Sequence, residues 1–150
     1  MTRRSVLLLL PSIPLGFTAV RGKEVMYVGG TVGVPEATEG ELETIDPKFL
    51  RFTSPKGKFE IPYEGVTSIE YGQKAGRRLG VAVAITVWAL FSKKRKHFLT
   101  IGFKDNTDQP QGVVLELPKG TPKSVITIIE ARSGLKCEYE SEEARKHVHG

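Results

Sequence analysis

The sequence predicts a mainly β (α+β) domain, a small barrel of about seven strands followed by one amphipathic helix. Short segments rich in Val, Ile, Phe and Tyr lie between residues 24 and 117, and Gly, Pro, Asn and Asp separate them, as turns separate strands. Apolar residues recur at helical spacing only after Leu117. A helix that follows a run of strands can cover one open end of a bent sheet, which indicates a barrel.

Length and composition indicate a single domain. The chain has 150 residues, of which 39% are apolar and 26% are charged, and these values are ordinary for one globular domain. We expect this domain at residues 23–139, between an N-terminal segment at residues 1–22 and a charged tail at residues 140–150. The charged tail is expected to fray.

The first half of the predicted sheet contains five strands. The first strand includes Gly29 and Gly30, which indicate a bulge or a sharp bend. Pro55 and Gly57 predict a tight turn, and the strand after this turn alternates polar with apolar side chains. The five predicted strands are residues 24–34, 41–46, 49–53, 58–63 and 65–71.

Two further strands, at residues 97–103 and 111–117, are joined by a polar hairpin loop. Asp105 and Asp108 in this loop could ligate Ca²⁺, but hairpin loops commonly use Asp to shape the turn, so we interpret them as turn residues. His97 stands at the start of its strand and is expected to be exposed.

A helix is predicted over residues 122–133. Thr121 can cap its start, Pro122 suits its first position, and Gly134 suits its end. Residues 136–139 then read as a short strand. This strand contains Cys137, the chain's single cysteine, which we interpret as a small buried residue because it has no partner for a disulfide and no neighbouring His.

The N-terminus resembles an export signal. Arg3 and Arg4 precede an apolar segment at residues 5–20, which is the order of a charged and then a hydrophobic region in signal peptides. We therefore expect an exported protein, periplasmic or associated with the cell envelope. Cleavage after Gly22 and retention as an uncleaved anchor both remain open, and a coincidental buried segment is the third alternative.

An uncharged apolar segment at residues 79–91 divides the predicted sheet. As a helix it would rise roughly 20 Å, too little to cross a hydrocarbon core of about 30 Å. Seven Lys or Arg residues and no acidic residue lie between Gln73 and His97, which leaves 15 basic against 17 acidic residues elsewhere. The positive excess of the chain therefore belongs to the flanks of this apolar insert, residues 76–96.

The strand order, with a C-terminal helix, resembles the pleckstrin-homology-like (PH-like) superfold, including its GRAM and bacterial groups. Residues 91–101 and 129–136 are also similar to segments of small uncharacterised bacterial proteins that carry an apolar insert at this place. The resemblance implies a fold, but PH-like domains have many ligands and partners. Members that bind phosphoinositides use basic residues in their first loop, whereas residues 34–40 here contain Glu36 and Glu39 and no Lys or Arg.

Three interpretations of the insert remain open. It could be buried against the barrel, it could lie in a membrane interface while its basic flanks meet lipid phosphates, or it could bind a protein partner. In the second and third cases the contact residues would be Arg77, Arg78, Trp88, Phe91, Lys93, Lys94, Arg95 and Lys96.

Motifs for catalysis and cofactors are missing from the sequence. It contains no G-x-S-x-G, H-E-x-x-H or paired C-x-x-C pattern, and we interpret His147 and His149 as residues of a polar tail instead of metal ligands. A nucleic-acid interface is unlikely to form from one basic cluster on an otherwise acidic domain. We therefore expect a non-catalytic binding or scaffold module without a cofactor. The first alternative is a soluble periplasmic protein-interaction domain with the insert buried in its core, and the second is an enzyme with an unrecognised site.

Overall fold

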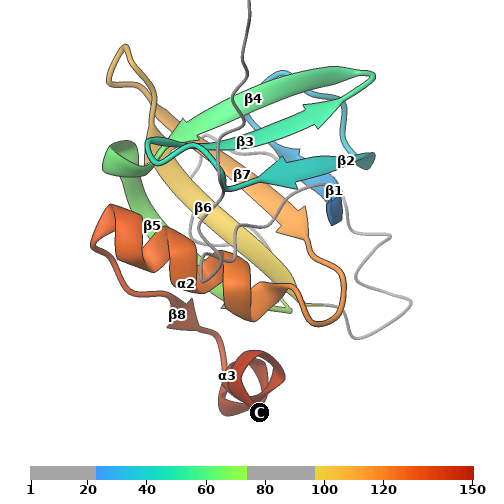
Figure 1. Ribbon diagram of the computed structural model, residues 1–150, viewed down its shortest axis with the longest axis vertical. Helices are drawn as coiled ribbons and strands as arrows, with labels where there is room; N and C mark the ends of the chain where they lie inside the picture. The colour runs from blue at the N-terminus through green and yellow to red at the C-terminus, as the bar shows by residue number, and fades with distance from the viewer. Residues whose placement is uncertain (1–22, 74–96) are drawn as a thin grey trace, which may run out of the picture.

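The computed structural model describes residues 23–73 and 97–150, which form an eight-stranded sheet with two α-helices (Figure 1). The prediction of a mainly β fold that ends with a helical region is confirmed. The strands are β1 (Lys23–Gly30), β2 (Thr38–Glu43), β3 (Phe49–Ser54), β4 (Gly57–Pro62), β5 (Val66–Gly72), β6 (Phe98–Lys104), β7 (Pro110–Glu116) and β8 (Glu138–Tyr139). The helices are the 3-10 turn η1 (Tyr63–Gly65), α2 (Pro122–Ser133) and α3 (Glu142–His149).

The described strands do not close into a barrel, so this part of the prediction is wrong. Their order is β4-β3-β2-β1-β7-β6-β5-β8, which leaves β4 and β8 at the two edges of one sheet. β8 runs parallel to β5, and every other neighbouring pair is antiparallel. Alternation along a strand reports which face is buried, but it does not report whether the two edges of a sheet meet.

The predicted irregularity in the first strand is present. The register of β1 against β7 shifts between Tyr27 and Gly29, which is the signature of a β-bulge. Gly30 follows with a φ of 154°, and a Cβ at this position would collide with the carbonyl oxygen of Gly112 on β7. The bulge therefore requires a residue without a side chain, because only then can β1 approach β7 so closely.

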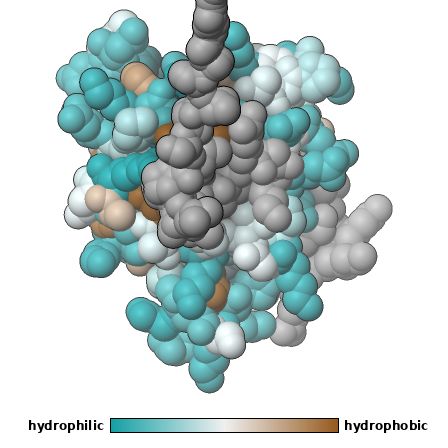
Figure 2. Space-filling model, viewed as in Figure 1, coloured by the Kyte–Doolittle hydropathy of each residue, from teal (hydrophilic) through white to brown (hydrophobic). Residues whose placement is uncertain are grey.

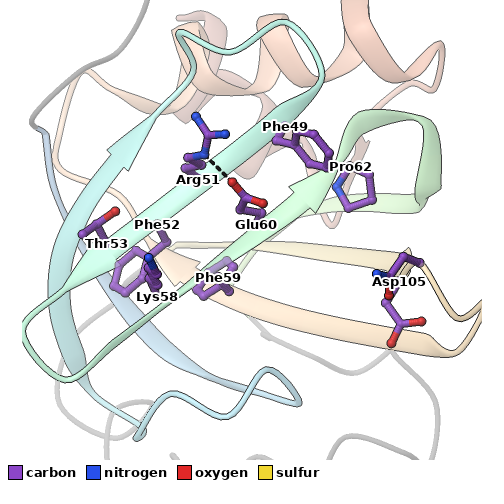
Figure 3. A pocket seen from close by; sticks show the side chains of 10 residues that line it. Phe49, Arg51, Phe52, Thr53, Lys58, Phe59, Glu60, Pro62 and Asp105 are labelled. Carbon is purple, nitrogen blue, oxygen red and sulfur yellow. Dashed lines mark hydrogen bonds and ion pairs between the residues drawn. The ribbon is translucent and has the colours of Figure 1, made fainter.

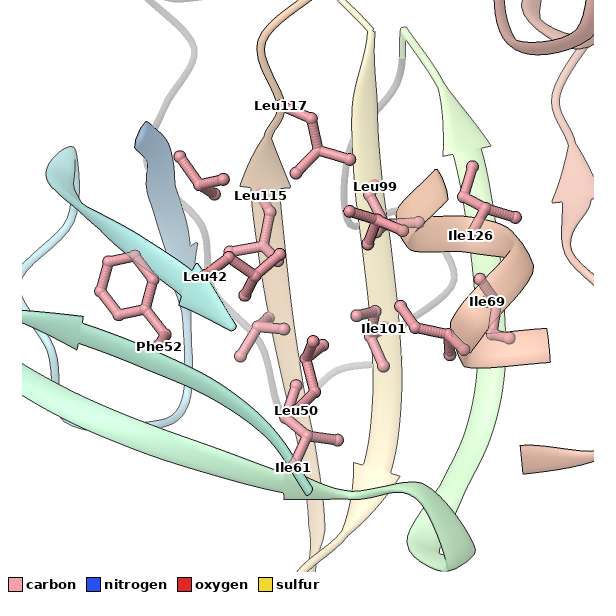
Figure 4. Close-up of a cluster of buried hydrophobic side chains, with 14 of the residues drawn as sticks. Leu42, Leu50, Phe52, Ile61, Ile69, Leu99, Ile101, Leu115, Leu117 and Ile126 are labelled. Atoms are coloured by element: carbon pink, nitrogen blue, oxygen red, sulfur yellow. The ribbon is translucent and has the colours of Figure 1, made fainter. Parts of the chain in front are cut away.

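The core lies between the inner face of the sheet and α2 (Figure 4). Five fully buried side chains from both halves of the sheet contribute to this core. They are Leu42, Leu50 and Ile61 from β2, β3 and β4, and Leu99 and Ile101 from β6. On α2 the buried apolar residues are Val125, Ile126 and Ile129. Burial of these side chains on one helix face is what fixes α2 against the sheet.

The bounds predicted for α2 are confirmed, but its predicted cap is wrong. Pro122 is the first helical residue, and Gly134 ends the helix with a φ of 80°, a left-handed conformation that glycine adopts easily. Thr121 precedes the helix in a helical conformation, and its side chain accepts no capping hydrogen bond. Thr121 is buried, so its side chain packs in the protein interior, where it does not bond to the N–H groups of the first helical turn.

The charged tail is a helix and not a frayed end. The Ser141 hydroxyl accepts a hydrogen bond from the backbone N–H of Ala144 at 3.1 Å and so caps α3. Ala144 and Val148, four residues apart on the helix, are both buried. Two apolar residues among many charges were too weak a signal in the sequence, although both are buried where α3 packs on the rest of the fold.

Candidate functional site

The insert leaves and re-enters the sheet at one point. β5 ends at Gly72 and β6 begins at Phe98, and these two residues are paired directly across the two strands. Gln73 and His97, which come next on either side, are therefore the two neighbouring attachment points of the segment between them. The chain therefore leaves the sheet toward one basic flank and returns from the other at the same end of the sheet.

The N-terminal segment joins the sheet at the same end. Tyr27, Leu115, Leu99 and Tyr71 form one row across β1, β7, β6 and β5, because each is paired with the next. β1 begins at Lys23 on the side of this row where β5 ends and β6 begins, as Figure 1 also shows. Three strand spacings of about 4.8 Å separate β1 from β5, so the two strands lie about 14 Å apart in the direction perpendicular to them.

The residues predicted to contact a membrane or a partner lie outside the described part of the chain. These are Arg77, Arg78, Trp88, Phe91, Lys93, Lys94, Arg95 and Lys96, and the export signal or anchor at residues 1–22 is outside it too. Whether residues 79–91 are buried or reach lipid therefore stays a prediction. Within residues 23–73 and 97–150, no helix has the length and apolarity needed to cross a membrane.

Three aromatic rings cluster where the insert attaches. His97 stacks on His147 from α3, with ring centroids 4.2 Å apart and an interplanar angle of 18°. Tyr71 from β5 stacks on both, at 5.6 Å from His97 and 5.9 Å from His147. The Tyr71 hydroxyl also forms a hydrogen bond of 2.9 Å with Nδ1 of His147. β5, β6 and α3 therefore meet in one stack of rings.

His97 is partly buried, which corrects the expectation of an exposed residue. Its Nε2 atom is shielded from solvent and has no hydrogen-bond partner among the described residues. Burial lowers the pKa of His97 below its usual value, and the neighbouring His147 lowers it further. Glu143 and Glu140 act on this pKa in the opposite direction but do not outweigh burial.

The rings of Tyr139 and His149 form a second contact between α3 and the sheet. The Tyr139 hydroxyl forms a hydrogen bond of 2.8 Å with Nε2 of His149, and the Arg145 guanidinium lies over the Tyr139 ring at 5.2 Å. Burial raises the pKa of Tyr139 to about 12, so this hydroxyl is neutral at ordinary pH. All three histidines of the chain thus contact tyrosines of β5 or β8, or stack beside them.

A pocket of about 600 Å³ lies on the other part of the sheet, at the edge formed by β3 and β4 (Figure 3). Arg51 and Glu60 face each other across these strands and form an ion pair, and Arg51 also pairs with Asp46 at 3.1 Å. Phe49 and Pro62 line the pocket beside them. The Arg51 guanidinium already has two carboxylate partners, and the exposed Lys58 is a second cation that lines the pocket.

Asp105 borders this pocket from the loop between β6 and β7. Its Oδ1 accepts hydrogen bonds from the N–H and hydroxyl of Thr107 and from the N–H of Gln109, at 2.6–2.9 Å. Its Oδ2 accepts from Gln111 at 3.0 Å. These bonds, led by the Thr107 hydroxyl, lower the pKa of Asp105 to about 2. The interpretation of Asp105 as a turn residue is confirmed.

A metal site has little support in the described residues. No group of three His, Cys, Asp or Glu side chains in residues 23–73 and 97–150 is arranged to hold a metal ion. His147 and His149 bond to different tyrosines, so they do not converge on one point. The rings of His97 and His147 lie nearly parallel, and their in-plane lone pairs cannot meet at a metal between them.

Sequence reasoning missed Tyr71 and His147 as members of a cluster, although part of the signal was present. Ser141 followed by Glu142 and Glu143 is typical of a helix start, and this pattern could have predicted α3. Nothing local in the sequence could show that this helix brings His147 to His97, fifty residues earlier. Comparison with known proteins adds no assignment, because no protein-family model and no curated protein sequence matches the chain.

Proposed function

We propose that this chain is a non-catalytic binding or scaffold module with a PH-like fold, which associates with an anionic membrane surface through the insert at residues 76–96. The observation that carries the proposal is the common attachment of two apolar segments. Residues 5–20 and 79–91 join the sheet at the same end, at Lys23 and at the Gly72–Phe98 pair. Two segments suited to lipid can therefore reach a single bilayer surface.

The distribution of charge favours this orientation. The described residues contain 12 Lys and Arg against 17 Asp and Glu, so all of the positive excess belongs to residues 1–22 and 74–96. An anionic surface repels the acidic sheet and attracts the segments at its one end. Each basic residue near such a surface contributes about 1 kcal/mol, and Trp88 and Phe91 suit the headgroup region.

The described surface offers no alternative apolar contact of comparable size. Figure 2 shows a largely hydrophilic face with small hydrophobic areas. Among the described residues, Ile45 is the exposed large hydrophobic residue, with 46% of its surface accessible. A single side chain of this kind is ordinary on a protein surface. Lipid contact is therefore better ascribed to the apolar segments than to the sheet.

The fold part of the proposal rests on the arrangement of strands and helix. An antiparallel succession of seven strands is followed by α2, which packs its apolar face into the interior of the bent sheet. This arrangement supports the PH-like resemblance even though the sheet is open. The acidic loop before β2, with Glu36, supports a contact elsewhere than at the usual phosphoinositide site.

Vesicle flotation of the full chain tests the membrane part. We expect more protein to float with phosphatidylserine-rich vesicles than with phosphatidylcholine vesicles. We also expect the difference to shrink as salt rises from about 0.1 M to 1 M, because the screening length then falls from about 10 Å to 3 Å. Equal binding to both vesicle types at low salt would contradict the proposal and would point to the N-terminal segment alone.

A matched pair of variants assigns the contact. Replacement of Lys93, Lys94, Arg95 and Lys96 by Gln removes four charges from the insert, and we expect it to abolish the preference for anionic vesicles. The control replaces Lys48, Lys56, Lys58 and Lys119, four exposed residues of the sheet and its loops, by Gln and changes the net charge equally. If both variants lose the preference to the same extent, the contact is not specific to the insert.

A further inference from the structure

α3 packs against β5, β8 and α2, and its contact with β5 includes the stacked rings of Tyr71 and His147. Its buried apolar residues are Ala144 and Val148, and its longest-range polar contact is the hydrogen bond between His147 and Tyr71. The Ser141 cap fixes where the helix begins, and the hydrogen bond between Tyr139 and His149 holds its last turn. A helix of eight residues is marginal by itself, so its contacts with neighbouring elements decide whether it stays docked.

We propose that α3 is a pH-sensitive latch, which docks on β5 and β6 while His97 and His147 do not both carry a proton and is released when both do. This inference concerns α3 alone and does not depend on the proposed membrane association. The stacked arrangement tolerates one imidazolium, but two would place like charges at ring centroids only 4.2 Å apart.

The surroundings of His97 oppose its charged form. Its Nε2 atom is buried and finds no acceptor among the described residues, so an added proton there would have no hydrogen-bond partner. Tyr71 covers the ring from β5 and is neutral, because burial raises the pKa of its hydroxyl. His147, by contrast, is exposed on α3.

Two carboxylates face His97 and act against the release. Glu143 lies on α3, and Glu140 lies between β8 and α3, where its backbone N–H bonds to the carbonyl oxygen of Tyr71 at 3.0 Å. Both attract a positive charge on His97. Since the pKa of His97 is lowered in spite of them, burial and His147 together have the larger effect.

The direction of the pH effect follows from this lowered pKa. With α3 released, His97 regains a pKa near its usual value of about 6.5, so protons favour the released state. Docking is therefore strongest above about pH 6.5 and weakens as pH falls through the lower pKa of the docked state. One unit of difference between the two pKa values corresponds to about a tenfold change in the docking equilibrium.

Thiol labelling at a buried position of α3 measures the docking. The full chain with Cys137→Ser and Val148→Cys carries one thiol beneath α3, and 4,4′-dithiodipyridine labels thiols over a wide pH range. The rate is divided by that of the same protein unfolded in urea at the same pH, which removes the intrinsic effect of pH on the thiol. We expect protection at about pH 8 and a loss of it at about pH 5.

Histidine variants separate the latch from general acid instability. His97→Phe keeps a ring in the stack but cannot take a proton, and we expect protection to be equal at the two pH values. His149→Gln, on the same helix but bonded to Tyr139, is the matched control and should keep the pH dependence. Equal protection in the parent protein at both pH values, or a retained loss in His97→Phe, would overturn the proposal.

A second labelling position guards against a local effect of the reporter. Ala144→Cys, again with Cys137→Ser, places the thiol at the other buried position of α3. The two reporters should lose protection together, because the helix leaves as a unit. If neither thiol is protected at about pH 8, α3 is not docked on the sheet and the latch does not exist.

Discussion

Arg132 on α2 donates a hydrogen bond from Nη1 to the backbone carbonyl oxygen of Thr44, 88 residues earlier, at 2.6 Å. The same nitrogen reaches the carbonyl oxygen of Asp46 at 3.1 Å and the hydroxyl of Tyr63 at 3.3 Å. The guanidinium also lies 5.3 Å from the centre of the Tyr63 ring. One side chain thus ties the end of α2 to the β2–β3 turn and to η1, where the sheet bends.

Replacement of Arg132 by Ala should destabilise the fold by about 2–3 kcal/mol, because hydrogen bonds from a charged donor to the oxygens of Thr44, Asp46 and Tyr63 are lost. Urea denaturation followed by circular dichroism measures this change. Arg132→Lys should fall between Ala and the parent protein, since Lys keeps the charge without the planar fork. Lys123→Ala, at an exposed position of α2, serves as the control, and an equal loss there would contradict the assigned role.

Asp105 should make the fold sensitive to acid below pH 4. Its pKa is about 2 in the folded protein and close to 3.8 in the unfolded chain, so the folded state holds its proton less tightly. Its contribution to stability is present above the unfolded pKa and is lost as pH falls through the folded pKa. Asp105→Asn should flatten this part of the stability profile, measured by urea denaturation at a series of pH values.

Asp108 provides the comparison for Asp105 within the same loop. Asp108 has a φ of 63°, a conformation that Asn also adopts readily, and its side chain forms only a long contact of 3.8 Å with Lys104. Asp108→Asn should therefore leave the acid profile unchanged. A flattened profile in Asp108→Asn, or an unchanged one in Asp105→Asn, would show that the hydrogen-bonded Asp105 is not the group responsible.

Cys137 should be unreactive in the folded protein. Its side chain is buried, and burial together with the nearby Glu130 carboxylate raises the pKa of the thiol to about 12. Since the thiolate is the reactive form, labelling with iodoacetamide at about pH 8 should be at least about a hundredfold slower than in the urea-unfolded chain. Rates that differ by less than about tenfold would mean that residues 136–139 open easily.

The strands and α2 were largely predictable because each has a local signature. Gly134 at the end of α2 and the turn at Ser54–Gly57 needed only the conformational preferences of Gly and Pro. The bulge near Gly29 was visible in the same way. Closure of the sheet was not predictable, since β4 and β8 become edges only through the packing of distant strands.

The residues of the candidate site also differ in whether a local pattern in the sequence could reveal them. The sequence shows which segments are apolar and basic, and it therefore named Arg77, Arg78 and the cluster at residues 93–96, which lie outside the described structure. It could not place His147 beside His97, because docking of α3 depends on Ala144 and Val148 finding a complementary surface on the sheet. Such contacts join residues far apart in the chain and leave no local pattern.

The sequence by itself determined the mainly β character of this protein, the course of α2 and the concentration of positive charge beside one apolar segment. Each follows from periodicity, turn chemistry or composition, which are local properties of the chain. Only the tertiary structure decided that the sheet stays open, that the tail forms α3, and that Lys23, Gly72 and Phe98 lie at one end of the sheet. Those outcomes depend on the register and packing of strands that are distant in sequence, and register is a property of the assembled sheet.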